Sequence, residues 1–273
     1  MPTMNRSVVV GVDPSGPNRA AVDWAAAEAL ARKAVLRLFH ARSGGASEDE
    51  AQVLDREWTR VTGEHPGLTV VAELVDGAAR EALTDAATDA ALLVVGSRGS
   101  GGFAGLLVGS TTLYAAAHAP CPVAVVRDAA PVGRGVVVGA EGKDGEGPVL
   151  EYAFETARRQ SWPLLVLHTW SYPLVLVSGH DVPPVYEKAH VGAEHERLLA
   201  EVLAGRRERF PDVPVTTSVV HSGAAKELVA LSERHGLVVV GRRGEPGGAI
   251  GRLGSTSQAV VQHARGPVVV VPV

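Results

Sequence analysis

A glycine-rich segment followed by a serine and a threonine is the part of this sequence best suited to chemistry. It contains Gly96, two intervening residues, Gly99, nine further residues, and then Gly109-Ser110-Thr111. Glycines let backbone N–H groups approach an anion closely. Ser110 stands where a helix is expected to begin, and helix N-termini attract negative charge. The segment therefore predicts a phosphate site, although glycines of this kind also form simple turns before helices.

The same spacing occurs a second time, as Gly241, Gly244 and Gly254-Ser255-Thr256. It differs from the two commonest phosphate motifs. It lacks the Gly-Lys-Ser/Thr ending of a P-loop, and it is not a G-x-G-x-x-G sequence after a first strand. The prediction of a phosphate ligand therefore depends on the backbone argument alone.

The repeated segment belongs to a duplication of the whole chain. Residues 8–13 recur as residues 136–141, and residues 36–40 recur as residues 164–168, in both cases 128 positions later. Blocks that recur in one order indicate two copies of a structural unit. We therefore predict two domains, residues 1–130 and 131–273, joined by a short linker near residues 128–134.

The offset between the copies grows in the second part of the repeat. Residues 93–99 match residues 238–244, which are 145 positions later, whereas residues 77–81 match residues 223–227 at an offset of 146. The second copy therefore carries about 17 additional residues. We expect them in an enlarged, proline-containing loop that includes residues 171–184.

The apolar runs of each copy are short, rich in valine and not alternating, as in strands that are covered on both faces. In the first copy they occupy residues 8–12, 35–39, 68–75, 92–95 and 123–126. Helical patterns separate them at residues 18–34, 48–62, 78–88 and 111–118. This order predicts an α/β fold with two tandem, doubly wound domains. Ligands of such sheets bind beyond the carboxyl ends of the strands, where the winding reverses.

Composition excludes several classes of partner. The net charge is −4 and the pI is about 6.2, so we expect no nucleic-acid partner. Cys121 is the single cysteine, which rules out an intrachain disulfide and favours a reducing compartment. We find neither a signal-peptide pattern nor an apolar run long enough to span a membrane. The expected location is the cytoplasm, without membrane attachment.

Together these residues resemble the universal stress protein family. The resemblance depends on Gly11-Val12-Asp13 ending the first strand, His40 ending the second, and the G-x2-G-x9-G-Ser segment after the fourth. It covers essentially all of both halves, and the tandem arrangement is common in actinobacteria. It implies two five-stranded parallel sheets of order 3-2-1-4-5, flanked by helices. It also implies that residues 123–126 pair with residues 268–271 within one chain, with a homodimer as a further option.

The resemblance implies binding of ATP, together with Mg²⁺, at equivalent positions of the two halves. In the first half the implied binding residues are Gly11, Val12, Asp13, Ala41, Val95, Gly96, Gly99, Gly109, Ser110 and Thr111. In the second half they are Gly139, Ala140, Glu141, Thr169, Val240, Gly241, Gly244, Gly254, Ser255 and Thr256.

The second copy departs from the first in ways that weaken a phosphate site. Glu141 replaces Asp13, and Glu245-Pro246 replaces Ser100-Gly101. Proline has no N–H group to donate, and a glutamate opposes the charge of a phosphate. We therefore expect the first domain to be the stronger ATP site.

The predicted function is regulatory, through conformations or partner contacts that depend on the bound adenine nucleotide in a stress response. We expect no enzyme, no catalytic residue and no metal site, since none of the ten histidines has a metal-ligand spacing. His190, Glu194 and His195 are expected to lie together only by chance. Two alternatives stay open: slow adenine-nucleotide hydrolysis involving Asp13, and a scaffold dimer without a ligand.

Overall fold

Ten strands form one continuous sheet in the described part of the chain. The computed structural model describes residues 7–13, 19–42, 48–98, 107–127, 133–142, 146–171, 188–242 and 253–273. The valine-rich runs become the strands because β-branched side chains favour extended backbone. The strands are β1 (Ser7–Gly11), β2 (Val35–Arg42), β3 (Val70–Asp76), β4 (Ala90–Gly96), β5 (Val123–Val126), β6 (Val136–Ala140), β7 (Leu164–Trp170), β8 (Val215–His221), β9 (Leu237–Arg242) and β10 (Val268–Pro272).

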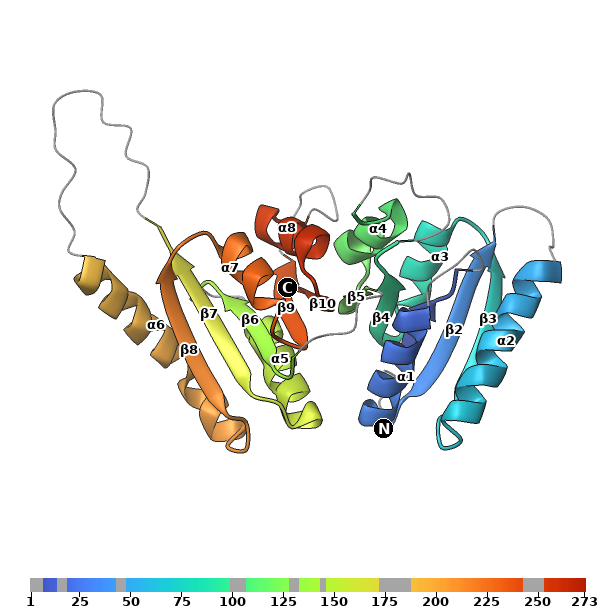
Figure 1. The fold of residues 1–273 in the computed structure, drawn as a ribbon, viewed down its shortest axis with the longest axis horizontal. Helices are drawn as coiled ribbons and strands as arrows, with labels where there is room; N and C mark the ends of the chain where they lie inside the picture. The colour runs from blue at the N-terminus through green and yellow to red at the C-terminus, as the bar shows by residue number, and fades with distance from the viewer. Residues whose placement is uncertain are drawn as a thin grey trace, which may run out of the picture.

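The strand order is β3-β2-β1-β4-β5-β10-β9-β6-β7-β8. Each half is therefore a parallel sheet of order 3-2-1-4-5, which confirms the predicted fold. The halves meet where β5 and β10 pair antiparallel, with Ala124 opposite Val269. The expected pairing of the two last strands is thereby confirmed. Figure 1 shows the two halves spreading from this central pair.

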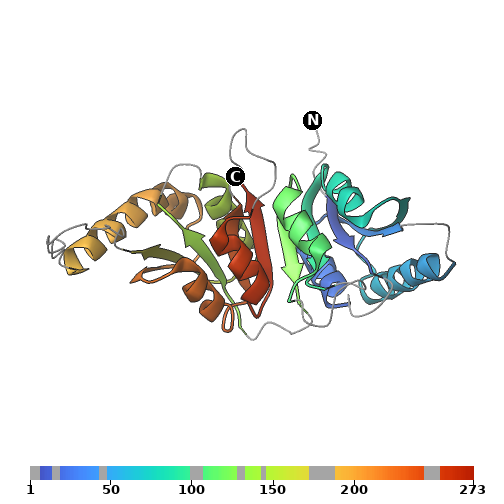
Figure 2. The same ribbon diagram turned by 90° about the horizontal axis from the view of Figure 1, so that it is seen from above.

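Helices cover both faces of the sheet (Figures 1 and 2). One face carries α1 (Arg19–Arg32), α2 (Glu48–Glu64), α5 (Gly147–Gln160) and α6 (Lys188–Arg209). The other face carries α3 (Ala79–Ala86), α4 (Ser110–His118), α7 (Ala224–Leu231) and α8 (Ser255–His263). Within the described ranges, none of these helices is both long and apolar enough to cross a membrane.

The core consists of two apolar layers, one on each side of the sheet. Val8 and Val10 belong to the layer under α1, whereas Val9 belongs to the layer under α3 and α4. This alternation follows from the pleat of a strand, which directs successive side chains to opposite faces. All three valines are fully buried, and each burial stabilises the fold by about 1.5–3 kcal/mol.

The structure corrects one of the two offsets between the halves. β8 begins 145 positions after β3, and α7 begins 145 positions after α3. The match of residues 77–81 to residues 223–227, at an offset of 146, is therefore wrong by one residue. Both copies contain the letters Gly-Ala-Ala, but the residue that precedes the helix is Ala78 in one and Gly223 in the other.

Candidate functional site

The carboxyl ends of β1, β2 and β4 pack against apolar side chains on the face covered by α3 and α4. A Cβ atom at Gly11 would lie 3.2 Å from Leu83 Cδ2 and 3.9 Å from Val95 Cγ1. Val95 and Leu83 belong to the apolar layer on this face, and Ala41 packs against it. Glycine at position 11 therefore lets Leu83 of α3 pack closely against the end of β1, at the place where the winding of the sheet reverses.

The N-terminus of α4 is anchored beside these strand ends. The Gly109 N–H donates to the Ser97 carbonyl oxygen at 2.8 Å. The Thr112 hydroxyl donates to the Gly96 carbonyl oxygen at 2.7 Å. These bonds tie the first turn of α4 to the end of β4, and they bring Gly96 and the Gly109-Ser110 step together. Thr112 was missed by the sequence reasoning, although the second copy has a hydroxyl residue, Ser257, at the same place.

No described side chain caps this end of α4. The N-cap residue is Gly109, with extended backbone (φ −70°, ψ 154°), and no side-chain bond caps the helix. Ser110 is the first residue of the helix and is exposed, so its hydroxyl stands one position too late to act as the cap. A helix N-terminus without a side-chain cap presents N–H groups that an anion can accept.

The second half repeats this geometry. A Cβ atom at Gly139 would lie 3.3 Å from Leu228 Cδ1, and Val240 lies in the same apolar layer. Gly254 is the N-cap of α8, again without a side-chain bond. The Ser257 hydroxyl donates to the Gly241 carbonyl oxygen at 2.6 Å. The two halves therefore share one backbone arrangement at their strand ends.

The turn after β6 is closed by an acidic side chain. The Glu146 carboxylate accepts the N–H of Glu141 and, at 3.1 Å, the N–H of Gly142. Gly142 has φ 74°, a conformation that favours glycine. Glu146 was not singled out from the sequence. The only signal would have been an acid immediately before the α5 helix, where it can bond to nearby N–H groups.

Two equivalent histidines hold the ends of neighbouring strands together. His40 Nδ1 lies 2.8 Å from the Val12 carbonyl oxygen, and His168 Nδ1 lies 2.9 Å from the Ala140 carbonyl oxygen. A carbonyl oxygen only accepts, so Nδ1 carries the proton in both rings. The bond from His40 fixes the backbone immediately before Asp13.

The other ring nitrogen of each histidine has a different neighbour. His40 Nε2 lies 3.7 Å from Glu50 Oε1 on α2. His168 Nε2 lies 2.9 Å from His195 Nδ1 on α6, and the His195 ring stacks on Trp170 with ring centroids 5.5 Å apart. Burial lowers the pKa of His195, and His168 lowers it further. The sequence reasoning assigned His195 no such contact. The described residues contain no group of three histidine, cysteine or acidic side chains placed to hold a metal ion.

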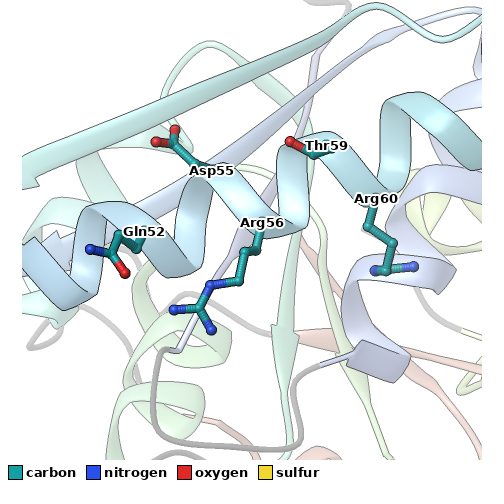
Figure 3. A pocket seen from close by; sticks show the side chains of 5 residues that line it. All are labelled: Gln52, Asp55, Arg56, Thr59 and Arg60. Carbon is teal, nitrogen blue, oxygen red and sulfur yellow. The ribbon is translucent and has the colours of Figure 1, made fainter.

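A hollow of about 490 Å³ lies on α2 (Figure 3). It is lined by Gln52, Asp55, Arg56, Thr59 and Arg60, which all belong to this one helix. The guanidinium of Arg60 already pairs with the carboxylates of Asp23, Glu57 and Glu64 at 2.6–2.8 Å. The hollow therefore lacks polar groups converging from several elements, which a ligand site needs.

The predicted site residues fall at the expected edge of the sheet wherever the structure describes them. In the first half these are Gly11, Val12, Asp13, Ala41, Val95, Gly96, Gly109, Ser110 and Thr111. In the second half they are Gly139, Ala140, Glu141, Thr169, Val240, Gly241, Gly254, Ser255 and Thr256. Gly99 and Gly244 lie outside the described residues, as do Ser100, Gly101, Glu245 and Pro246. Which of these residues contact a ligand stays a prediction.

Each half has a parallel sheet of order 3-2-1-4-5 and a Gly-Ser step at the start of the helix after its fourth strand. These features define a class of α/β protein with two tandem domains of one family. The chain belongs to the universal stress protein family, whose model matches residues 4–127 and 134–272. It is 37% identical over 291 residues to a universal stress protein of Mycobacterium tuberculosis strain H37Rv, covering 96% of this chain and 95% of the relative. Another universal stress protein of that strain is 35% identical over 295 residues, covering 98% of both chains.

A solved structure of a family member shows the same fold. The universal stress protein from Archaeoglobus fulgidus DSM 4304 matches with a TM-score of 0.69 and covers 98% of this chain and 97% of its own. The sequence identity of this pair is 16%, so the likeness concerns the fold alone.

Proposed function

We propose that this protein binds ATP, together with Mg²⁺, at the strand ends of its first half, and that occupancy regulates its conformation or its contacts with partners. The observation that carries the proposal is the start of α4. Its N-terminus has no side-chain cap among the described residues and is bonded to the end of β4, beside Ala41 and Val95 of the apolar layer.

The adenine ring would lie against the apolar residues at these strand ends, and the phosphates would accept hydrogen bonds from N–H groups at the start of α4. Asp13 lies two residues after the end of β1, where its carboxylate can accept hydrogen bonds from the hydroxyl groups of the ribose. Each hydrogen bond to a charged oxygen contributes about 1.5–3 kcal/mol. Three or four such bonds plus ring burial, less the cost of association, correspond to a Kd of about 1 μM.

We further propose that the second half binds the nucleotide more weakly. Its turn after β6 already bonds to the Glu146 carboxylate, which adds a negative charge at the strand ends. Like charges at short range repel, so a phosphate nearby would bind less well. The replacement of Asp13 by Glu141 and of Ser100-Gly101 by Glu245-Pro246 points in the same direction.

Matched substitutions at the two helix starts test the site. Ser110→Asp places a carboxylate in the first turn of α4, which favours the helix dipole but repels phosphate. We expect it to weaken ATP binding at least tenfold while the thermal midpoint is kept or raised. Ser255→Asp makes the same change in α8 and should leave the tight site intact. Equal weakening by both variants, or by neither, would contradict the proposed location.

We propose binding rather than turnover as the activity. The measurement is prolonged incubation of the purified protein with Mg-ATP, with Asp13→Ala as the comparison. We expect no ADP above the rate without protein. ADP release that Asp13→Ala abolishes would favour the alternative of a slow hydrolase. Mass spectrometry of nucleotide released from denatured protein tests the other alternative, a scaffold without a ligand.

A further inference from the structure

The antiparallel pairing of β5 with β10 is centred on two equivalent residues, and the flanking pairs are related by an approximate twofold axis. Ala124 faces Val269, which is its counterpart 145 positions later, and Val123 and Val125 face Val270 and Val268. We call these six residues the strand seam. It is almost self-complementary, because each half presents a short run of small or β-branched residues in the same register. The strand seam alone would let a half pair with a copy of itself almost as well as with the other half.

A second contact between the halves, on the face covered by α1 and α5, is not self-complementary. We call it the helix seam. Its centre is the Glu28 carboxylate of α1, which is 3% exposed. Glu28 Oε1 accepts from Arg32 Nε at 3.0 Å and from Arg159 Nη2 at 2.7 Å. Glu28 Oε2 accepts from Gln160 Nε2 at 3.3 Å, and Arg32 Nη2 donates to the Tyr152 hydroxyl at 3.0 Å.

The duplication gives none of these residues an equivalent of the same kind. With the offset of 128, Glu28 corresponds to Thr156, Arg159 to Ala31, and Gln160 to Arg32. The first half therefore supplies the only carboxylate of these four bonds, and the second half supplies a cation and an amide that need it. A buried charge is tolerated only when it is paired, so this difference affects which halves can meet.

Glu28 and its equivalent Thr156 both bond to the same nitrogen atom of Arg159. Arg159 Nη2 lies 2.7 Å from Glu28 Oε1 and 3.0 Å from Thr156 Oγ1. In a pair of two first halves, Arg32 would take the place of Gln160 beside the Glu28 of the other copy, so two carboxylates would meet two guanidinium groups. In a pair of two second halves, two Arg159 side chains would meet without the buried Glu28 carboxylate.

We propose that Glu28 and Arg159 determine the choice of partner in this protein. The strand seam supplies affinity, and the helix seam restricts pairing to a first half with a second half. The partner that fits this surface is the other half of the same chain, or of a second copy in a reciprocal exchange. Pairs of two second halves are rejected because their Arg159 side chains would lack the Glu28 carboxylate. Since the two halves are present in equal numbers, second halves that avoid each other pair with first halves.

The test uses the full chain, folded first and then cut at a protease site introduced at residues 128–132, so that neither half has to fold alone. Cut protein with natural and with ¹⁵N-labelled isotopes is mixed and incubated until the labels have exchanged between pairs. Native mass spectrometry then counts first-first, first-second and second-second pairs. Random pairing would give like and unlike pairs in equal amounts, whereas we expect at least a tenfold excess of unlike pairs.

Four variants show whether the helix seam causes that excess. Glu28→Thr removes the carboxylate that an unlike pair offers to Arg159, and Arg159→Ala removes the cation that needs it, so each should lower the excess at least tenfold. Arg158→Ala removes a neighbouring arginine that packs over Phe210 within the second half, and it should change nothing. The double exchange of Glu28→Arg with Arg159→Glu should restore the preference, which a merely structural loss would not do.

Three outcomes would overturn the proposal. The first is random pairing in the cut wild-type protein, and the second is separation of its halves into single units. The third is an unchanged excess of unlike pairs in both Glu28→Thr and Arg159→Ala.

Discussion

At the scale of residues, Glu146 bonds to two N–H groups of the turn after β6, and Asn18 stands at the equivalent position of the first half. Asparagine is neutral, so the first half carries no such charge at this position. Thr169 in place of Ala41 and Glu141 in place of Asp13 add smaller differences around the same backbone. The asymmetry that we propose between the two sites therefore depends on a few side chains.

Neutralising Glu146 should strengthen the second site. In Glu146→Gln the amide oxygen can still accept one N–H, while the negative charge is lost. We expect calorimetric titration with ATP to show a second binding event, at least tenfold tighter than in the wild-type protein. Glu155→Gln, an exposed position on the same helix, serves as the control and should have no effect. A second site that is equally weak in both variants would show that Glu146 is not its cause.

His195 should make stability fall in mild acid. Burial and His168 lower its pKa in the folded state, while Glu194 opposes them. The unfolded state then binds more protons, so the contribution is complete above about pH 6.5 and is lost as the pH falls below it. We expect the thermal midpoint to drop less between pH 7 and pH 5.5 in His195→Phe, which keeps the stack on Trp170. An identical drop in both proteins would contradict this role.

At the scale of elements, the strands and helices could be predicted because valine runs favour extended backbone and alanine-rich stretches favour helix. The ends of elements were harder to predict, as the one-residue error at α7 shows. The glycine-serine edge was expected from its spacing and from the family resemblance. The bonds of Glu28 and His195 could not be predicted, because the first depends on how α1 and α5 of different halves pack and the second on how α6 packs against β7.

An arginine of the second half bonds to the C-terminal end of α4 in the first half, so its substitution tests whether one half stabilises a helix of the other. Arg242 on β9 donates to the carbonyl oxygens of Ala117 and, at 2.8 Å, Ala119. Burial lowers the pKa of Arg242. Its buried charge therefore destabilises the fold unless the two carbonyl oxygens accept its hydrogen bonds. Arg242→Met should lower the free energy of unfolding by about 1–3 kcal/mol in urea titrations. Arg265→Met, at an exposed arginine, should cost almost nothing, and equal losses would refute the role in capping.

At the scale of the whole molecule, duplication has produced one ten-stranded sheet in which the last strands of the two halves, β5 and β10, pair with each other. The strand seam joins them with almost no preference, and the helix seam supplies the preference. The two proposed differences between the halves are independent, since one concerns the helix seam and the other the strand ends. Loss of nucleotide binding would therefore leave the pairing experiment valid, and the reverse also holds.

Calorimetric titration of the nucleotide-free full chain with ATP in the presence of Mg²⁺ tests the central claim most directly. The account predicts one tight site per chain with a Kd of about 1 μM, which Ser110→Asp weakens and Ser255→Asp does not. No binding of ATP to the wild-type chain at concentrations up to about 1 mM would contradict it.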